Sequence, residues 1–201
     1  MIAPSDRQDS VDRPRSRADT AFVMLSLTLA LMANPCAAAD DGARPLVGEV
    51  VEHAKAVWDR GAVTTALEIL DLGLGVHPEA VTLHKVRGDI LSTFRNPQEA
   101  VQAYDRVLAV QPAALDVRWA KWGLLVRWGQ EEEAIAELHN IARIDAMNPL
   151  IHWRLAQELR KLDRLEESLE SYKQAVQLMP DLLSWRLALA RSRFDVLDYQ
   201  G

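Results

Sequence analysis

Tryptophan and arginine are the residues of this chain whose types and spacing are best suited to binding another molecule. Trp119 and Trp153 lie 34 residues apart, and polar or basic residues accompany them along the chain. Those residues are Arg127, Arg154, Gln157, Arg160, Lys161 and Arg191. A tryptophan ring offers a large apolar contact area, and the forked guanidinium of arginine grips carboxylates. We predict that these side chains share one surface and bind a protein or peptide partner there.

Two other interpretations of the tryptophans stay open. A stack of tryptophan rings can hold the apolar face of a sugar, so a polysaccharide is an alternative ligand. Alternatively, Trp119 and Trp153 pack between helices as part of the core and bind nothing.

Residues that could catalyse a reaction form no recognisable pattern. No two of the five histidines stand four residues apart, as a helical metal site would require. They are His53, His77, His84, His139 and His152. The sequence contains no glycine-rich phosphate loop and no nucleophile motif. We therefore predict a protein that is not an enzyme and has no cofactor or metal.

Composition and charge exclude two further classes. The chain has 201 residues, of which 49% are hydrophobic and 26% charged, so disorder throughout is excluded. Its net charge of −6 argues against binding driven by nucleic-acid phosphates. We predict no nucleic-acid partner.

The first 39 residues have the features of a removable signal peptide. Arginines precede an apolar run from Ala21 to Met32, which is shorter than the roughly 20 residues that span a membrane. Small residues at 37–39 then offer a cleavage site before Asp40. We predict a signal peptide at 1–39, a short linker at 40–46, and a periplasmic or secreted protein that is soluble after cleavage. A membrane anchor formed by the uncleaved segment is the alternative.

A period of 34 residues runs through the rest of the chain without an insertion. One series of mostly small residues is Ala54, Gly88, Trp122, Ala156 and Ala190. Twelve residues after its first four members come Ala66, Ala100, Ala134 and Ser168, and four further on Leu70, Tyr104, Leu138 and Tyr172. The period closes with Pro78, Pro112, Ala146 and Pro180. Small residues let two antiparallel helices approach closely, a large residue fills the space beside them, and proline ends the second helix.

On these residues the chain resembles the tetratricopeptide-repeat family. The match is best in the second repeat, from Gly88 to Pro112, and in the fourth, at Arg164–Pro180. The repeats are placed at 47–80, 81–114, 115–148 and 149–182, with a partial repeat at 183–201. The resemblance implies an all-α, right-handed solenoid of antiparallel helix pairs, about four and a half repeats long. It also implies a concave groove, lined by the first helix of each repeat, and the tryptophan and arginine columns are expected there.

The pattern further predicts nine helices and no sheet, with two irregular places. Ala146 replaces the closing proline of the third repeat, so we expect its junction with the fourth repeat to be irregular. A fifth first helix is expected to begin near Asp181 and to end in a turn at Asp198-Tyr199. Several of its residues are apolar, which favours a chain that continues beyond Gly201 or a partner that covers this helix.

The leading hypothesis is a non-catalytic protein–protein interaction scaffold in the bacterial envelope. One alternative is the periplasmic part of an outer-membrane exporter of polysaccharide or surface lipoprotein. Such a chain is truncated before its β-barrel and would be membrane-associated through that missing region. Another alternative is an assembly factor for an envelope complex or cytochrome.

Overall fold

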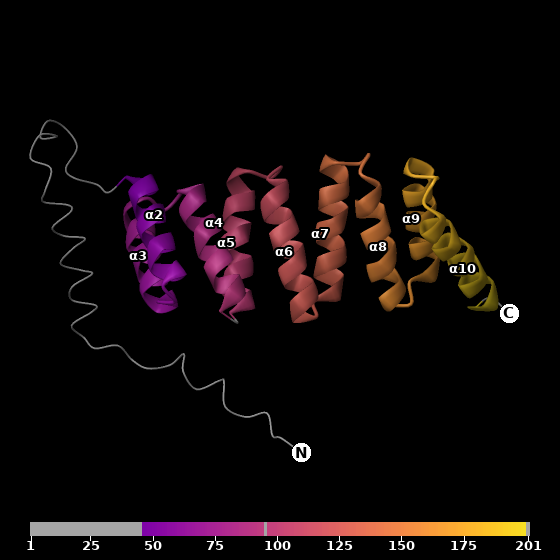
Figure 1. Ribbon diagram of the computed structural model, residues 1–201, viewed down its shortest axis with the longest axis horizontal. Helices are drawn as coiled ribbons and strands as arrows, with labels where there is room; N and C mark the ends of the chain where they lie inside the picture. Colours follow the sequence, from indigo (N-terminus) through magenta and orange to yellow (C-terminus); the bar gives the residue numbers. More distant parts are fainter. Residues whose placement is uncertain (1–45, 95, 200–201) are drawn as a thin grey trace, which may run out of the picture. The chain divides into compact units, whose positions relative to one another are not determined.

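The computed structural model describes residues 46–94 and 96–199, and every regular element within these residues is an α-helix. The predicted signal peptide and nearly all of the predicted linker lie outside the described residues. The helices are α2 (Val47–Asp59), α3 (Val63–Val76), α4 (Val81–Thr93), α5 (Pro97–Val110), α6 (Leu115–Trp128), α7 (Glu131–Ile144), α8 (Pro149–Lys161), α9 (Leu165–Leu178) and α10 (Leu183–Tyr199) (Figure 1). The prediction of nine helices and no strand is confirmed for this part of the chain.

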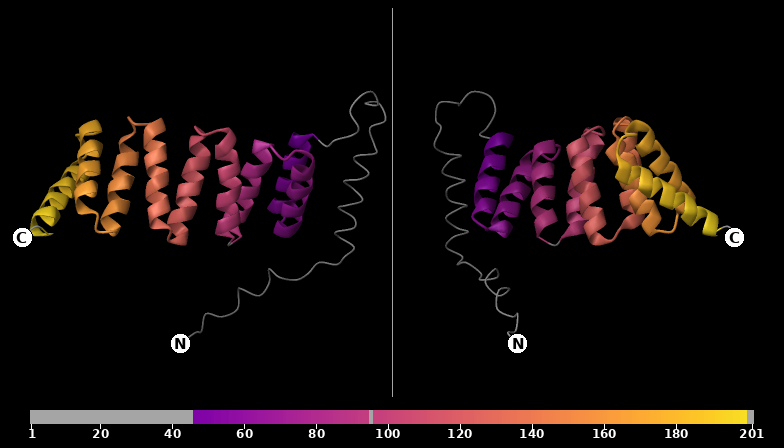
Figure 2. Two further views of the ribbon diagram at one scale, coloured as in Figure 1. Left: turned by 180° about the vertical axis from the view of Figure 1, so that it is seen from behind. Right: turned by 45° about the vertical axis from the view of Figure 1, so that its right-hand side comes forward.

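Successive helices pair into hairpins, and the chain forms two compact units. In the unit that ends at Pro78, α2 packs against α3. In the unit from Glu79 to Gly201, α4 pairs with α5, α6 with α7, and α8 with α9, while α10 packs on α9. Within this second unit each hairpin also contacts the next, through α5 with α6 and α7 with α8 (Figures 1 and 2). The architecture is an all-α solenoid.

In three of the hairpins, α2–α3, α6–α7 and α8–α9, the turn contains a residue in the left-handed region. Gly61, Gly129 and Asp163 have φ of 80°, 76° and 54°, and they occupy equivalent positions of the 34-residue period. Glycine takes this conformation without a steric penalty, and aspartate tolerates it better than most residues. The first helix therefore stops at a fixed point, and the chain reverses into the second helix within a few residues.

The junction of the third and fourth repeats is regular, so the expectation of an irregular join is wrong. Four residues separate α7 from α8, as they separate α5 from α6. The residue that ends α7, Asp145, has φ −127° and ψ 64°, close to the −125° and 75° of Gln111 at the end of α5. Proline disfavours the helical region for the residue before it, but Asp145 reaches the same conformation without one. Asn148 supplies the stabilisation instead, because its side-chain amide donates to Asp145 Oδ2 at 3.0 Å and its Oδ1 accepts from the Leu150 amide.

Helix α10 also differs from its expected end. It extends to Tyr199, so the backbone of Asp198 and Tyr199 is helical and does not form the predicted turn. With 17 residues, α10 is longer than the 13 or 14 residues of every other described helix. None of the described helices combines the length and the apolar character needed to cross a membrane.

The small and large residues of the period meet as pairs in the core. Tyr104 on α5 is 1% exposed and lies directly against Gly88 on α4. Its hydroxyl donates to Asp89 Oδ1 at 2.9 Å, and burial followed by the charge of Asp89 raises the pKa of this phenol. In the fourth repeat the Ser168 hydroxyl donates to the Ala156 carbonyl at 2.8 Å, so α8 and α9 also approach closely at this position.

Replacing Gly88 by alanine should destabilise the protein by about 1–2 kcal/mol, although alanine is the better helix former. A Cβ at position 88 would lie 2.7 Å from Tyr104 Cε1, and this buried ring has no room to withdraw. Gly123→Ala is the matched control, because a Cβ there meets nothing within 4 Å. The control should stabilise α6 by about 0.5–1 kcal/mol. Urea unfolding of both variants makes the comparison, and equal effects would mean that the Gly88–Tyr104 contact is not tight.

Candidate functional site

Two of the predicted site residues, Trp119 of α6 and Arg154 of α8, both contact Trp122 of α6, which was not among the predicted site residues. Trp119 and Trp122 of α6 pack edge to face, with ring centroids 5.4 Å apart and planes at 90°. Arg154 of α8 places its guanidinium carbon 5.8 Å from the centre of the Trp122 ring, at the distance of a cation–π contact. Arg154 is exposed, and both tryptophans are partly buried against the apolar cluster between α7 and α8. We call Trp119, Trp122 and Arg154 the α6–α8 aromatic site.

Trp153 lies in a second aromatic group, formed by α8, α9 and α10. Its ring stacks on Trp185 of α10 at 4.8 Å with an angle of 8° between the planes, and Tyr172 of α9 approaches it at 5.0 Å. Arg160 of α8 pairs with Asp195 of α10 at 2.6 Å beside this group. Burial raises the pKa of the Tyr172 phenol. We call Trp153, Tyr172 and Trp185 the α8–α10 stack, and it joins the last helix to the preceding hairpin.

The other predicted site residues are spread over the first helices. Arg127 and Arg191 are exposed, and Gln157 is half-buried. Lys161 is exposed and pairs at 2.7 Å with Glu158 of its own helix. The structure therefore brings Trp119 together with Trp122 and Arg154, and Trp153 together with Trp185. It assigns Arg160 and Lys161 to ion pairs within the chain.

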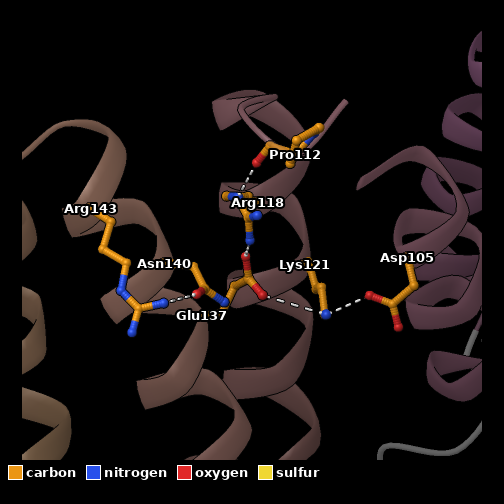
Figure 3. Close-up of polar contacts among 7 residues, drawn as sticks. All are labelled: Asp105, Pro112, Arg118, Lys121, Glu137, Asn140 and Arg143. Carbon is orange, nitrogen blue, oxygen red and sulfur yellow. Dashed lines mark hydrogen bonds and ion pairs between the residues drawn. The ribbon is translucent and has the colours of Figure 1, made fainter. Parts of the chain in front are cut away.

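A buried charge network joins α5, α6 and α7, and the sequence analysis did not find it. Glu137 of α7 accepts from Arg118 Nη1 at 2.5 Å and pairs with Lys121 Nζ at 3.4 Å (Figure 3). Lys121 also reaches Asp105 of α5 at 2.5 Å, and Arg118 Nε donates to the Pro112 carbonyl at 2.8 Å (Figure 3). The Glu137 side chain is only 4% exposed. Since Glu137 pairs with two cationic side chains, Arg118 and Lys121, the buried carboxylate is compensated.

This network could have been predicted from the 34-residue period. Glu137 occupies the position held by Ile69, Ala103 and Ser171 in the other repeats, and all three are buried. A carboxylate in a buried column needs a cationic partner, which predicts basic residues on a facing helix. Arg118 and Lys121 on α6 are those residues.

A depression of about 390 Å³ lies between α7, α8 and α9. Its lining residues are His139, Ala142, Arg143, His152, Leu155, Leu159, Glu167, Glu170, Ser171 and Gln174. Burial, followed by the charge of Arg164, lowers the pKa of His139. No group of three or more His, Cys, Asp or Glu side chains that could hold a metal occurs among the described residues.

The comparison with protein families identifies the repeat. Residues 149–182, which comprise α8, α9 and the connection that follows, match the family model named "Tetratricopeptide repeat". This part of the chain is similar to a tetratricopeptide repeat. The matched residues include Trp153, Arg154 and Tyr172, so each of the two aromatic groups has at least one member within the matched segment.

Solved structures of MamA share the helical solenoid fold of this chain. A segment of MamA from Desulfovibrio magneticus RS-1 is 19% identical and has a TM-score of 0.58, covering 76% of this chain and 86% of that one. A double mutant of MamA RS-1 has a TM-score of 0.59 at the same identity and coverage. MamA AMB-1 is 22% identical with a TM-score of 0.57, covering 74% and 79% of the two chains. At these identities the similarity extends to the fold alone. The comparison with curated proteins gave no match.

Proposed function

We propose that this protein is a non-catalytic scaffold of the bacterial envelope that binds a protein partner on the first helices α6, α8 and α10. The α6–α8 aromatic site carries the proposal. The exposed Arg154 lies over the ring of Trp122, which packs against Trp119, and Arg154 makes no ion pair with any described residue. Tryptophan and arginine at the centre of a contact are the residues that most often dominate binding energy.

A protein ligand fits this arrangement better than a polysaccharide does. Sugar binding by stacking needs an accessible ring face. Trp153 and Trp185 stack face to face, so each ring has one face covered by the other. Trp119 and Trp122 pack edge to face, so one of these two rings also has a face covered. By contrast, the guanidinium of Arg154 is accessible and suits a carboxylate from a peptide or an acidic surface.

The envelope assignment is supported by the sequence before Asp40. An apolar run of signal-peptide length is followed there by small residues that suit a signal peptidase. N-terminal sequencing of the exported protein should begin at Asp40 or a close neighbour, which makes the assignment testable without knowledge of the partner.

The binding site is tested by capturing partners from an envelope extract on the full chain and on two charge-reversed variants. Arg154→Glu should reduce recovery of the specific partner at least about tenfold, because it removes the cation from the tryptophan pair and repels carboxylates. Arg143→Glu makes the same charge change at an exposed position of α7 and should leave recovery unchanged. Equal recovery with both variants, or a loss with Arg143→Glu alone, would show that the partner binds elsewhere.

A further inference from the structure

Helix α10 is fixed to the rest of its unit along one side only. Ser192 and Val196 are buried, Trp185 stacks on Trp153, and Asp195 pairs with Arg160. All these residues lie within about 120° of arc on the helix, at 100° per residue. The contacts therefore fix which side of α10 is turned away from α8 and α9.

The opposite side of α10 is an exposed apolar stripe. Leu183, Leu187, Phe194 and Leu197 are between 62% and 69% exposed, and Ala190 completes the series. Their spacing alternates between four and three residues, which is the spacing of a seam that packs against another helix. The five residues occupy an arc of roughly 80°. We call this stripe the α10 outer face.

The 34-residue period shows what packs at this position elsewhere in the chain. Ala190 is equivalent to Ala156 and Ala54, which are both 0% exposed because the second helix of their hairpin covers them. Ala190 itself is exposed. At Ala190 the α10 outer face therefore has a small residue at a position that a second helix covers in other hairpins.

The charges that border this face indicate the character of the helix that fits it. Arg186 and Arg193 flank one edge and Arg191 the other. All three are exposed, and none makes an ion pair with another described residue. Two second helices of this chain are themselves acidic in their first turn: α7 has Glu131, Glu132 and Glu133, and α9 has Glu166 and Glu167.

We propose that the α10 outer face binds an acidic amphipathic helix of a partner protein. Apolar residues of that helix, spaced three and four apart, pack on the leucine and phenylalanine stripe, and its carboxylates pair with the bordering arginines. An anionic membrane surface is a poorer match, because helices that lie in a membrane interface use a broad apolar face and many cations. This surface is distinct from the α6–α8 aromatic site, so the two are tested by different variants.

The test uses a displayed library of helical peptides about three heptads long, selected on the full chain. Apolar seam positions are fixed, and the positions bordering the seam vary among Glu, Gln and Lys. Glu should be enriched at least about fivefold at the borders on the unaltered chain. On the Arg186→Glu/Arg193→Glu variant the preference should change to Lys. Arg106→Glu/Arg143→Glu matches its net charge at exposed positions of α5 and α7 and should keep the preference for Glu.

Three results would overturn the proposal. The first is a selection with no charge preference or no enrichment at all. The second is a dimer of the full chain in sedimentation that Leu187→Glu abolishes, because a second copy would then be the occupant. The third is binding to vesicles of anionic phospholipid that Leu187→Glu abolishes, which would assign the face to a membrane.

Discussion

Replacing Glu137 by alanine should lower the free energy of unfolding by about 3–5 kcal/mol, the cost of breaking a buried ion pair from one side. Arg118 and Lys121, whose side chains are 13% and 17% exposed, would lose the carboxylate that compensates them. The cost is high because low exposure strengthens the charge interactions of the network and also the penalty for an uncompensated charge. Urea denaturation followed by circular dichroism measures the change.

Two variants serve as controls for the Glu137 result. Glu137→Gln keeps the shape of the side chain but loses the charge. Its free energy of unfolding should therefore lie between those of the unaltered chain and Glu137→Ala. Glu132→Ala removes one of the two carboxylate partners of Arg164 at a position where the glutamate side chain is 68% exposed, and it should cost less than about 1 kcal/mol. A Glu137→Ala variant as stable as Glu132→Ala would show that the network contributes little.

Replacing Trp153 by alanine should cost about 3 kcal/mol of stability, the lower end for truncating a packed aromatic residue. The ring contacts Tyr172 and Trp185 at once, so its loss weakens the attachment of α10. Amide hydrogen exchange should accelerate most in α10, and thermal unfolding gives the total. If Trp153 served only to bind a partner, its truncation would lower the affinity for that partner and leave the stability of the protein nearly unchanged.

The stack itself is tested by a double-mutant cycle. Trp185→Ala should lower stability about as much as Trp153→Ala. The loss of stability in the double variant should be smaller than the sum of the two single losses by about 0.5–1.5 kcal/mol. Trp128→Ala is a control in a helix of the same unit, because Trp128 is 36% exposed and makes no ring contact with the described residues. Additive losses for Trp153 and Trp185, or unchanged stability of Trp153→Ala with lost partner binding, would contradict the expected role.

The helices and their pairing could be predicted because the 34-residue period places small residues where the two helices of a hairpin approach each other closely. Gly88 admits Tyr104, and Ala156 accepts the hydrogen bond of Ser168, so each small residue identifies where two helices meet. The junction before α8 was predicted wrongly because proline was treated as the cause of the helix end. Asp145 adopts the same backbone conformation with the help of Asn148.

The side-chain contacts of the candidate site were less predictable. Trp153 and Trp185 lie 32 residues apart, two short of the period, so the register gave no reason to stack them. Arg160 belongs to the predicted columns, but a column does not reveal that Asp195 of the next first helix neutralises it. The repeat predicts the backbone position of each side chain, whereas its contacts also depend on its rotamer and on the residues of the neighbouring repeats.

The stacking of hairpins in the unit from Glu79 onward has a consequence for how that unit assembles. Each helix contacts chiefly those next to it in sequence, so nearly all contacts close short loops. Proteins dominated by such local contacts fold fast, and the order of assembly follows the energy of each added element rather than a single obligatory nucleus. Helix α10 contacts the rest of the unit mainly through α9, with the Trp153–Trp185 and Arg160–Asp195 contacts to α8. It is therefore the element expected to join late and to detach first, as a hinged end that opens while the α8–α9 hairpin stays closed.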